Sequence, residues 1–175
     1  MNRRQWITII GICFLALMAG AFSSHWFSQN RAVNGEAVKA VFTNEWQSPD
    51  GKAINTSAWE GKVLVLNFWA SWCPPCVEEM PQLDQLQRQF SGKNVLFVGI
   101  AVDSPSNVRD FLKKTPVSYP IVMGGMNASS IYKALGNTQS ALPYTVVISP
   151  QGKVIETKLG KIDEDSLKKA INSSF

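Results

Sequence analysis

A continuous apolar run ends just before two cysteines that are three residues apart. Residues 62–69, KVLVLNFW, are rich in β-branched and aromatic side chains, the composition of a central strand buried on both faces. Over residues 74–90 apolar side chains recur at spacings of three and four, which predicts a helix with a bend at Pro81. Cys73 and Cys76 stand where the strand meets the helix. This arrangement constrains the fold more than any other segment.

The rest of the chain alternates apolar strand patterns with amphipathic helix patterns. This alternation, closed by a hairpin, predicts an α/β fold with a central mixed β-sheet flanked by helices. Two short strands joined by an Asp50-Gly51 turn are expected before the central strand. The short strands are expected at residues 38–43 and 52–55, the later strands at 94–102, 120–123, 144–149 and 153–159, and the later helices at 106–114, 129–135 and 164–172.

The N-terminus has the pattern of an exported, membrane-anchored chain. Arg3 and Arg4 precede an apolar run over residues 6–22, and no comparable basic cluster follows directly. As a helix this run reaches about 25 Å, and adding residues 25–27 closes the gap to the roughly 30 Å hydrocarbon layer. Because basic residues stay on the cytoplasmic side, we predict a single-pass anchor over residues 1–27 in the inner (cytoplasmic) membrane. The catalytic part then lies on the periplasmic or extracytoplasmic side.

A cleaved signal peptide is the alternative, since Ala19-Gly20-Ala21 fits a small-residue cleavage site. Residues 28–36 are polar and form the predicted linker, which leaves residues 37–175 as one folded domain. The formal net charge of +4 includes the two N-terminal arginines. The remaining balance is too small for a nucleic-acid footprint, so we expect no nucleic-acid partner.

The spacing of the two cysteines suits reversible disulfide chemistry. Side chains three residues apart in a first helical turn lie on one face, with α-carbons about 5 to 6 Å apart, the separation that a disulfide requires. Pro74 and Pro75 suit the start of a helix, which puts Cys73 at the N-cap, in the positive end of the helix dipole. A thiolate is favoured there, and lowering a thiol pKa from about 8.5 to about 7 makes half of it nucleophile at neutral pH.

Other uses of a Cys-x-x-Cys pair require residues that this sequence lacks. Structural zinc usually needs four protein ligands, and the chain offers besides the pair only Cys13, within the apolar run, and one histidine, His25. Covalent haem attachment needs a histidine directly after the second cysteine, where Val77 stands. Copper binding by the bare pair stays open, weakened by the missing histidine. We expect no bound metal and no other cofactor.

The motif and its surroundings resemble a known family. The segments LNFWASWCPPCVEEMP, residues 66–81, and LPYTVVISPQGKV, residues 142–154, are similar to the membrane-anchored thioredoxin-like proteins of the TlpA/ResA/DsbE group, within the redoxin superfamily. The resemblance implies a thioredoxin-like fold and thiol:disulfide oxidoreductase activity. It makes Cys73 the attacking thiol, Cys76 the resolving thiol and Pro143 a cis-proline that faces the disulfide.

Further residues complete the expected site. Thioredoxin carries a buried aspartate in the strand before the motif, where this sequence has Asn67, which cannot accept a proton. Glu79, one turn beyond the second cysteine, matches a glutamate of the ResA group, and we predict that it exchanges protons with the resolving thiol. A solvated helix glutamate is the alternative. A cis bond before Pro143 exposes backbone groups of Leu142 to an extended substrate segment, and Trp72 flanks the cleft as a rigid wall.

The resemblance also implies a direction and partners. The group mostly reduces disulfides, for example those of apocytochromes c or of copper-site proteins, in cytochrome c-type biogenesis, and a membrane thiol-transfer reductant recharges it. No cationic residue stands between the cysteines to favour a strong oxidant. A thiol-dependent peroxidase of the peroxiredoxin type, which carries threonine where Ala70 stands, and a non-catalytic copper chaperone are the alternatives.

Overall fold

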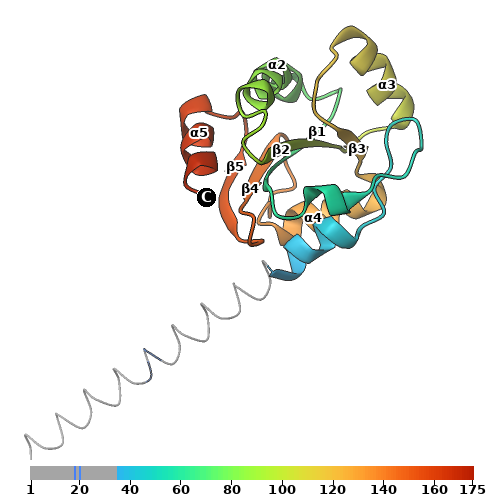
Figure 1. Ribbon diagram of the computed structural model, residues 1–175. Helices are drawn as coiled ribbons and strands as arrows, with labels where there is room; N and C mark the ends of the chain where they lie inside the picture. Colours follow the sequence, from blue (N-terminus) through green and yellow to red (C-terminus); the bar gives the residue numbers. More distant parts are fainter. Residues whose placement is uncertain (1–17, 19, 21–34) are drawn as a thin grey trace, which may run out of the picture. The chain divides into compact units, whose positions relative to one another are not determined.

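Five strands form one sheet in the order β3-β2-β1-β4-β5 in this computed structural model, which describes Met18, Gly20 and residues 35–175 (Figure 1). β1 pairs with β2 in parallel and with β4 in antiparallel orientation, so the sheet is mixed, as predicted. The elements are η1 (Thr56–Trp59), β1 (Val63–Trp69), α2 (Pro74–Gln89), β2 (Val95–Ala101), α3 (Pro105–Lys114), β3 (Ile121–Met123), η2 (Gly125–Asn127), α4 (Ala128–Ala134), β4 (Tyr144–Ile148), β5 (Val154–Leu159) and α5 (Glu164–Asn172).

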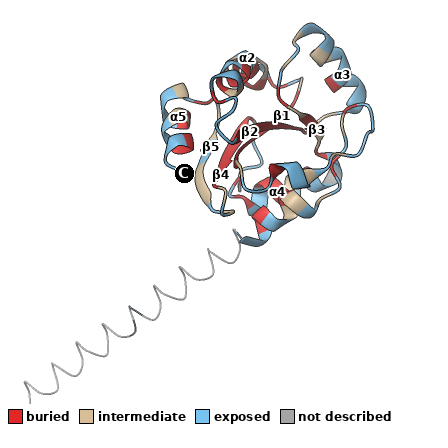
Figure 2. Cartoon of the chain, in the orientation of Figure 1, coloured by how far each residue is buried: buried red, intermediate tan, exposed pale blue. Residues whose placement is uncertain are grey.

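The central strand β1 is buried along its whole length. Successive side chains of a strand point to opposite faces, and here Leu64 and Leu66 join one apolar cluster while Val63 and Val65 join another. A strand that is apolar on both faces must be covered on both. Figure 2 shows the outcome, with buried strands between helices whose outer surfaces are exposed.

Helices cover both faces of the sheet. On one face α2, α3 and α5 pack against the odd-numbered side chains of β1, with Met80 of α2, Val108 of α3 and Leu167 of α5 in the same buried cluster. On the other face lie α4 and a helix formed by residues 35–43. The face with α2 is the one that carries the two cysteines.

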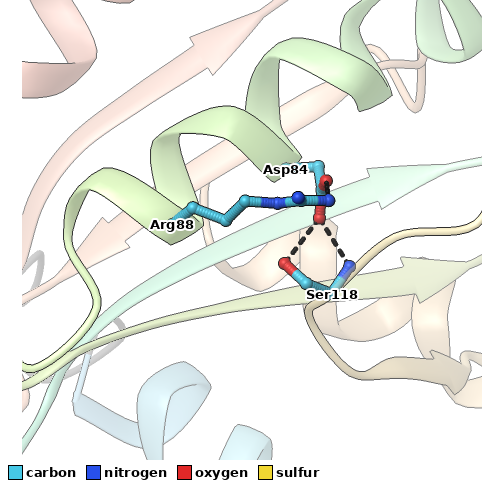
Figure 3. A network of polar contacts seen from close by, with 3 residues as sticks. All are labelled: Asp84, Arg88 and Ser118. Carbon is cyan, nitrogen blue, oxygen red and sulfur yellow. Dashed lines mark hydrogen bonds and ion pairs between the residues drawn. The ribbon is translucent and has the colours of Figure 1, made fainter.

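A buried carboxylate fastens α2 to the segment that leads into β3. Asp84 accepts hydrogen bonds from the amide and hydroxyl of Ser118 and from the guanidinium of Arg88, one helical turn away (Figure 3). Burial raises the pKa of Asp84, but the hydrogen bonds from Ser118 and Arg88 outweigh it and leave the pKa below its ordinary value. The helix that begins at the cysteines is therefore anchored near its middle by an ionised side chain.

The strand predicted over residues 38–43 is wrong, because residues 35–43 are helical. Ala37, Val38 and Val41 are buried against the sheet. Their spacings of three and four place them on one face of a helix, which a strand could not do. The last two residues of the predicted linker, residues 28–36, belong to this helix, and the others lie outside the described residues.

The turn predicted at Asp50-Gly51 is confirmed, with Gly51 donating to the carbonyl of Ser48 and adopting a φ of 78°. In place of the strand predicted over residues 52–55, the structure has an isolated bridge between Gln47 and Ala53. Within the part of the chain that the structure describes, no helix is long and apolar enough to cross a membrane. Apart from two helical positions at 18 and 20, the predicted anchor over residues 1–27 lies outside that part.

Candidate active site

The cysteine pair lies where β1 gives way to α2, and a disulfide joins the two residues with their α-carbons 5.3 Å apart. Cys73 is the N-cap of α2, as predicted, and Pro74 and Pro75 follow it. Because proline has no amide hydrogen, Cys76 is the first residue of the helix with an N–H to offer to the Cys73 sulfur. Cys73 is 5% exposed and Cys76 is fully buried. Of the two sulfur-bearing residues, only Cys73 can be approached from solvent.

The loop before Cys73 is anchored to the end of β2. Asp103 accepts hydrogen bonds from the amide and the hydroxyl of Ser71, and also from the Ser104 amide and the Asn107 side chain at the start of α3. Burial raises the pKa of Asp103, but these hydrogen bonds lower it by more. The pKa therefore lies below its ordinary value. Sequence reasoning missed this anchor. Its signal was a carboxylate at the carboxyl end of a parallel strand, where sites of α/β sheets gather.

The predicted substrate-contact residues differ in their exposure to solvent. Trp72 is 65% exposed. The Leu142–Pro143 bond is cis, as predicted. Pro143 is buried, and the half-buried Leu142 packs against the cluster that contains both cysteines. Asn137 donates to the Ala141 carbonyl at 2.8 Å and holds the loop before the proline. Substrate contact by these residues stays a prediction.

Glu79 is completely buried, so the alternative of a solvated glutamate is wrong. Its Oε1 accepts a hydrogen bond from Asn67 Nδ2 at 2.7 Å, and its Oε2 accepts one from the Ile162 amide at 3.0 Å. The neighbouring Glu78 is exposed and pairs with Lys161 at 3.1 Å. Sequence reasoning identified Asn67 as unable to accept a proton. It missed both that Asn67 donates to Glu79 and that the second donor lies 83 residues further along the chain.

The environment of Glu79 favours its neutral form. Burial raises the pKa of Glu79, and the hydrogen bonds from Ile162 and Asn67 and the charge of Lys161 offset this only in part. A carboxyl with a raised pKa exchanges protons closer to neutral pH than an ordinary glutamate does. Its action on Cys76 stays a prediction. Among Met18, Gly20 and residues 35–175, no three histidine, cysteine, aspartate or glutamate side chains are grouped to hold a metal ion.

A disulfide at the N-cap of the helix that follows a central strand, with a cis-proline before a neighbouring strand, defines a thiol-disulfide oxidoreductase of thioredoxin-like fold. Residues 34–171 match the family model described as Redoxin. A protein named "Thiol-disulfide oxidoreductase ResA" from Halalkalibacterium halodurans is 28% identical over 168 residues, which cover 93% of this chain and 90% of that relative. The protein of the same name from Bacillus subtilis is 31% identical over 72% of this chain and 69% of its own.

A solved structure agrees with these relatives. The thioredoxin-related protein from Neisseria meningitidis serogroup B is 37% identical, with a TM-score of 0.67 over 74% of this chain and 98% of that one. The chain therefore belongs to the redoxin family, and its Cys73–Cys76 pair is the redox dithiol of a thiol-disulfide oxidoreductase.

Proposed function

We propose that the protein reduces disulfides of proteins outside the cytoplasm. The observation that carries the exchange chemistry of this proposal is the asymmetry of the pair. Cys73 is the helix N-cap and has some exposure, whereas Cys76 is fully covered. The positive end of α2 and the Cys76 amide favour a Cys73 thiolate. The outer sulfur is suited to attack and the inner one to resolve.

The reaction balances as two exchange steps. The Cys73 thiolate attacks one sulfur of a substrate disulfide, the substrate S–S bond breaks, and the other substrate sulfur leaves as a thiolate. The Cys76 thiol then loses its proton, attacks the Cys73 sulfur in the mixed disulfide and releases the second substrate thiolate. Two electrons pass from the dithiol to the substrate, and the protein is left with the Cys73–Cys76 disulfide. A membrane thiol-transfer protein with a dithiol restores the reduced form.

Glu79 is the proton acceptor in the resolving step. Its buried carboxyl lies on α2 one turn beyond Cys76, and its pKa is raised by burial, so it accepts the Cys76 proton more readily near neutral pH than an ordinary, more acidic carboxyl does. Trp72 and the backbone of Leu142 and Pro143 contact the substrate segment that carries the disulfide.

The location follows from the N-terminal segment. An anchor over residues 1–27 holds the protein in the cytoplasmic membrane with the redox domain on the outer side. Disulfides form and persist in that compartment. Exported proteins with close cysteine pairs, such as apocytochromes c or copper-site proteins, are the substrates we propose.

Trapping of mixed disulfides tests the proposal. In cells that express the full chain with Cys13→Ala, a Cys76→Ser variant cannot resolve its mixed disulfides and should accumulate them, while Cys73→Ser and the double variant should not. We expect the captured proteins, identified after reduction, to be exported proteins with paired cysteines. Equal capture by Cys73→Ser, or capture of cytoplasmic proteins alone, would contradict the proposal.

The reduction potential tests the direction of transfer. A reductant in this compartment should have a reduction potential below about −220 mV, whereas a value of about −120 mV is typical of a strong oxidant. Equilibration of the full chain with glutathione buffers, read by alkylation of free thiols, gives this potential. Rapid consumption of peroxide by the reduced protein, or tight binding of Cu(I) without thiol exchange, would favour the peroxidase or the copper chaperone instead.

A further inference from the structure

Three consecutive residues between β5 and α5 each contact either Pro143 or the helix α2. The Gly160 amide donates to the Pro143 carbonyl at 2.9 Å. The Lys161 ammonium pairs with Glu78 at 3.1 Å, and the Ile162 amide donates to Glu79 at 3.0 Å. Residues 160–162 therefore connect the cis-proline to the helix that carries the cysteines.

The contact with the proline extends the sheet by one residue. β4 and β5 are antiparallel, with Tyr144 opposite Leu159, and the bond from Gly160 to Pro143 lies directly beyond this pair. Proline has no N–H, so its carbonyl is its only backbone hydrogen-bonding group. The Gly160 amide thus fixes the one polar backbone group of Pro143.

The direction of the segment depends on the backbone of Gly160. Its φ is 83°, in the left-handed region that side chains other than glycine adopt at a cost. No heavy atom lies within 4 Å of the place where a Cβ would be. A side chain at this position would therefore meet backbone strain and no steric clash. This turn takes the chain from the sheet edge to α2 within two residues.

The contact with Glu79 is one of the few that favour its charged form. From neighbouring elements the titratable groups that face Glu79 are Lys161, whose charge lowers its pKa, and Tyr119, whose ionisation the Glu79 charge opposes. The strands present neutral groups, Asn67 of β1 and Thr145 of β4, which are hydrogen-bonded to each other at 3.0 Å. Loss of the Ile162 amide would leave the carboxylate with Asn67 as its remaining hydrogen-bond donor.

We propose that residues 160–162 act as a positioning clamp that couples the substrate-binding loop at Pro143 to the proton acceptor Glu79. The inference rests on the proposed function of Glu79 and Pro143. Gly160 and Ile162 act through their backbone amides, so a substrate segment that displaces the Pro143 loop also displaces the donor that stabilises the Glu79 carboxylate. Substrate contact and the proton affinity of Glu79 are then linked by a path of two hydrogen bonds.

A matched pair of glycine substitutions tests the clamp in the full chain. Gly160→Ala imposes a side chain on a left-handed turn at one end of β5, and Gly152→Ala does the same at the other end, where φ is 74° and a Cβ would make only ordinary contact with Val38. Both variants should lose similar amounts of thermal stability. Only Gly160→Ala should change catalysis, because only Gly160 touches the site.

The assay is single-turnover reduction of a fluorescent disulfide peptide by the reduced protein, followed from pH 4 to 9. We expect Gly160→Ala to resolve the mixed disulfide about tenfold more slowly at neutral pH. The acidic limb of its pH profile should move upward by about one unit, the size expected when a carboxylate loses one hydrogen bond. The peptide concentration that gives the half-maximal single-turnover rate should rise severalfold. Lys161→Met should move the limb in the same direction by less.

Gly160→Asn should restore the wild-type profile, because asparagine tolerates the left-handed conformation. Lys161→Met serves as the test if the alanine variant does not fold, and an unchanged acidic limb in that variant would overturn the clamp. Identical profiles for Gly160→Ala and Gly152→Ala, with wild-type protein active, would overturn the clamp alone. A wild-type protein that fails to reduce the peptide would instead overturn the proposed function.

Discussion

The pKa values of two buried carboxyl groups on the same helix are shifted in opposite directions. Glu79 and Asp84 are five residues apart on α2, and both are removed from solvent. Burial raises the pKa of Glu79, and its hydrogen bonds do not cancel this. Burial also acts on Asp84, yet the hydrogen bonds from Ser118 and Arg88 hold its pKa below the ordinary value. Burial alone therefore does not decide the charge of a carboxyl group.

The difference lies in the donors. Both hydrogen bonds to Glu79 come from neutral amides, those of Asn67 and Ile162, while the nearby ammonium of Lys161 pairs with the exposed Glu78. Asp84 receives a guanidinium directly, together with an amide and a hydroxyl (Figure 3). The two hydrogen bonds from Ser118 lower the pKa of Asp84 most, and Arg88 adds a third hydrogen bond and a positive charge. Asp84 holds α2 in place as a charged group, and Glu79 has the raised pKa that the proposed proton exchange requires.

The largest expected effect is kinetic. Glu79→Gln removes the proton acceptor, and resolution of the mixed disulfide should slow by about 100-fold, the lower range for loss of a general base. The fall in the resolution rate at acidic pH should also disappear from the pH profile of this variant. Stopped-flow measurement of single turnovers gives both quantities. Asp84→Asn is the control and should keep the wild-type limb, and a Glu79→Gln profile identical to wild type would remove Glu79 from the mechanism.

The next effect is on stability. Asp84→Asn should lower the free energy of unfolding by about 2 kcal/mol at neutral pH, since Arg88 and Ser118 lose a charged acceptor. Because the folded-state pKa of Asp84 is depressed, its contribution is present above the unfolded value near 3.9 and is lost as pH falls through the folded value. Urea unfolding at several acidic pH values should therefore show a shallower loss of stability in the variant. An equal slope would mean that Asp84 is not held ionised.

Glu79 should change the pH dependence of the unfolding free energy in the opposite direction. Its folded-state pKa is raised, so the native protein holds a proton that the unfolded chain has lost. Stability should then fall as pH rises from about 4.3 to the folded value, by about 1.4 kcal/mol for each unit of pKa difference. The difference in unfolding free energy between wild type and Glu79→Gln, measured across this range, reports the slope. A difference that does not vary with pH would refute the raised pKa.

The smallest effect belongs to the exposed half of the Asp84 network. The Arg88 side chain is 69% exposed, and an exposed ion pair one helical turn apart contributes about 0.5 kcal/mol. Arg88→Met should cost about that amount at low ionic strength and less in high salt. Loss of more than about 1.5 kcal/mol would show that Arg88, rather than Ser118, holds Asp84 in its charged form.

Local sequence patterns predicted most of the fold. β1 and β2 are long apolar runs, and the spacing of Met80, Leu83 and Leu86 marks the buried face of α2. The helix at residues 35–43 was missed because its valines and phenylalanine have strand propensity. The signal against a strand was the spacing of Val38 and Val41. Here packing on the sheet overrides propensity.

The candidate site was predicted only in part. The cysteines and the N-cap follow from local spacing, because the atoms involved lie within one helical turn. The donors to Glu79 come from β1 and from a segment 83 residues away, and no local pattern specifies such contacts. The burial of Asp84 was equally invisible, since a charged residue in a helix is usually solvated. The long-range hydrogen bonds to Glu79 are therefore the part of the site that the cysteine motif does not predict.

The two cysteines are buried, whereas Trp72, the residue before Cys73, is exposed. Cys73 is almost covered and Trp72 is exposed, so in the proposed reaction a polypeptide substrate contacts the Trp72 ring before its disulfide reaches the Cys73 sulfur. Such an arrangement separates recognition from reaction. For the proposed function we therefore expect the dithiol to react faster with protein disulfides that fit this surface than with small disulfides.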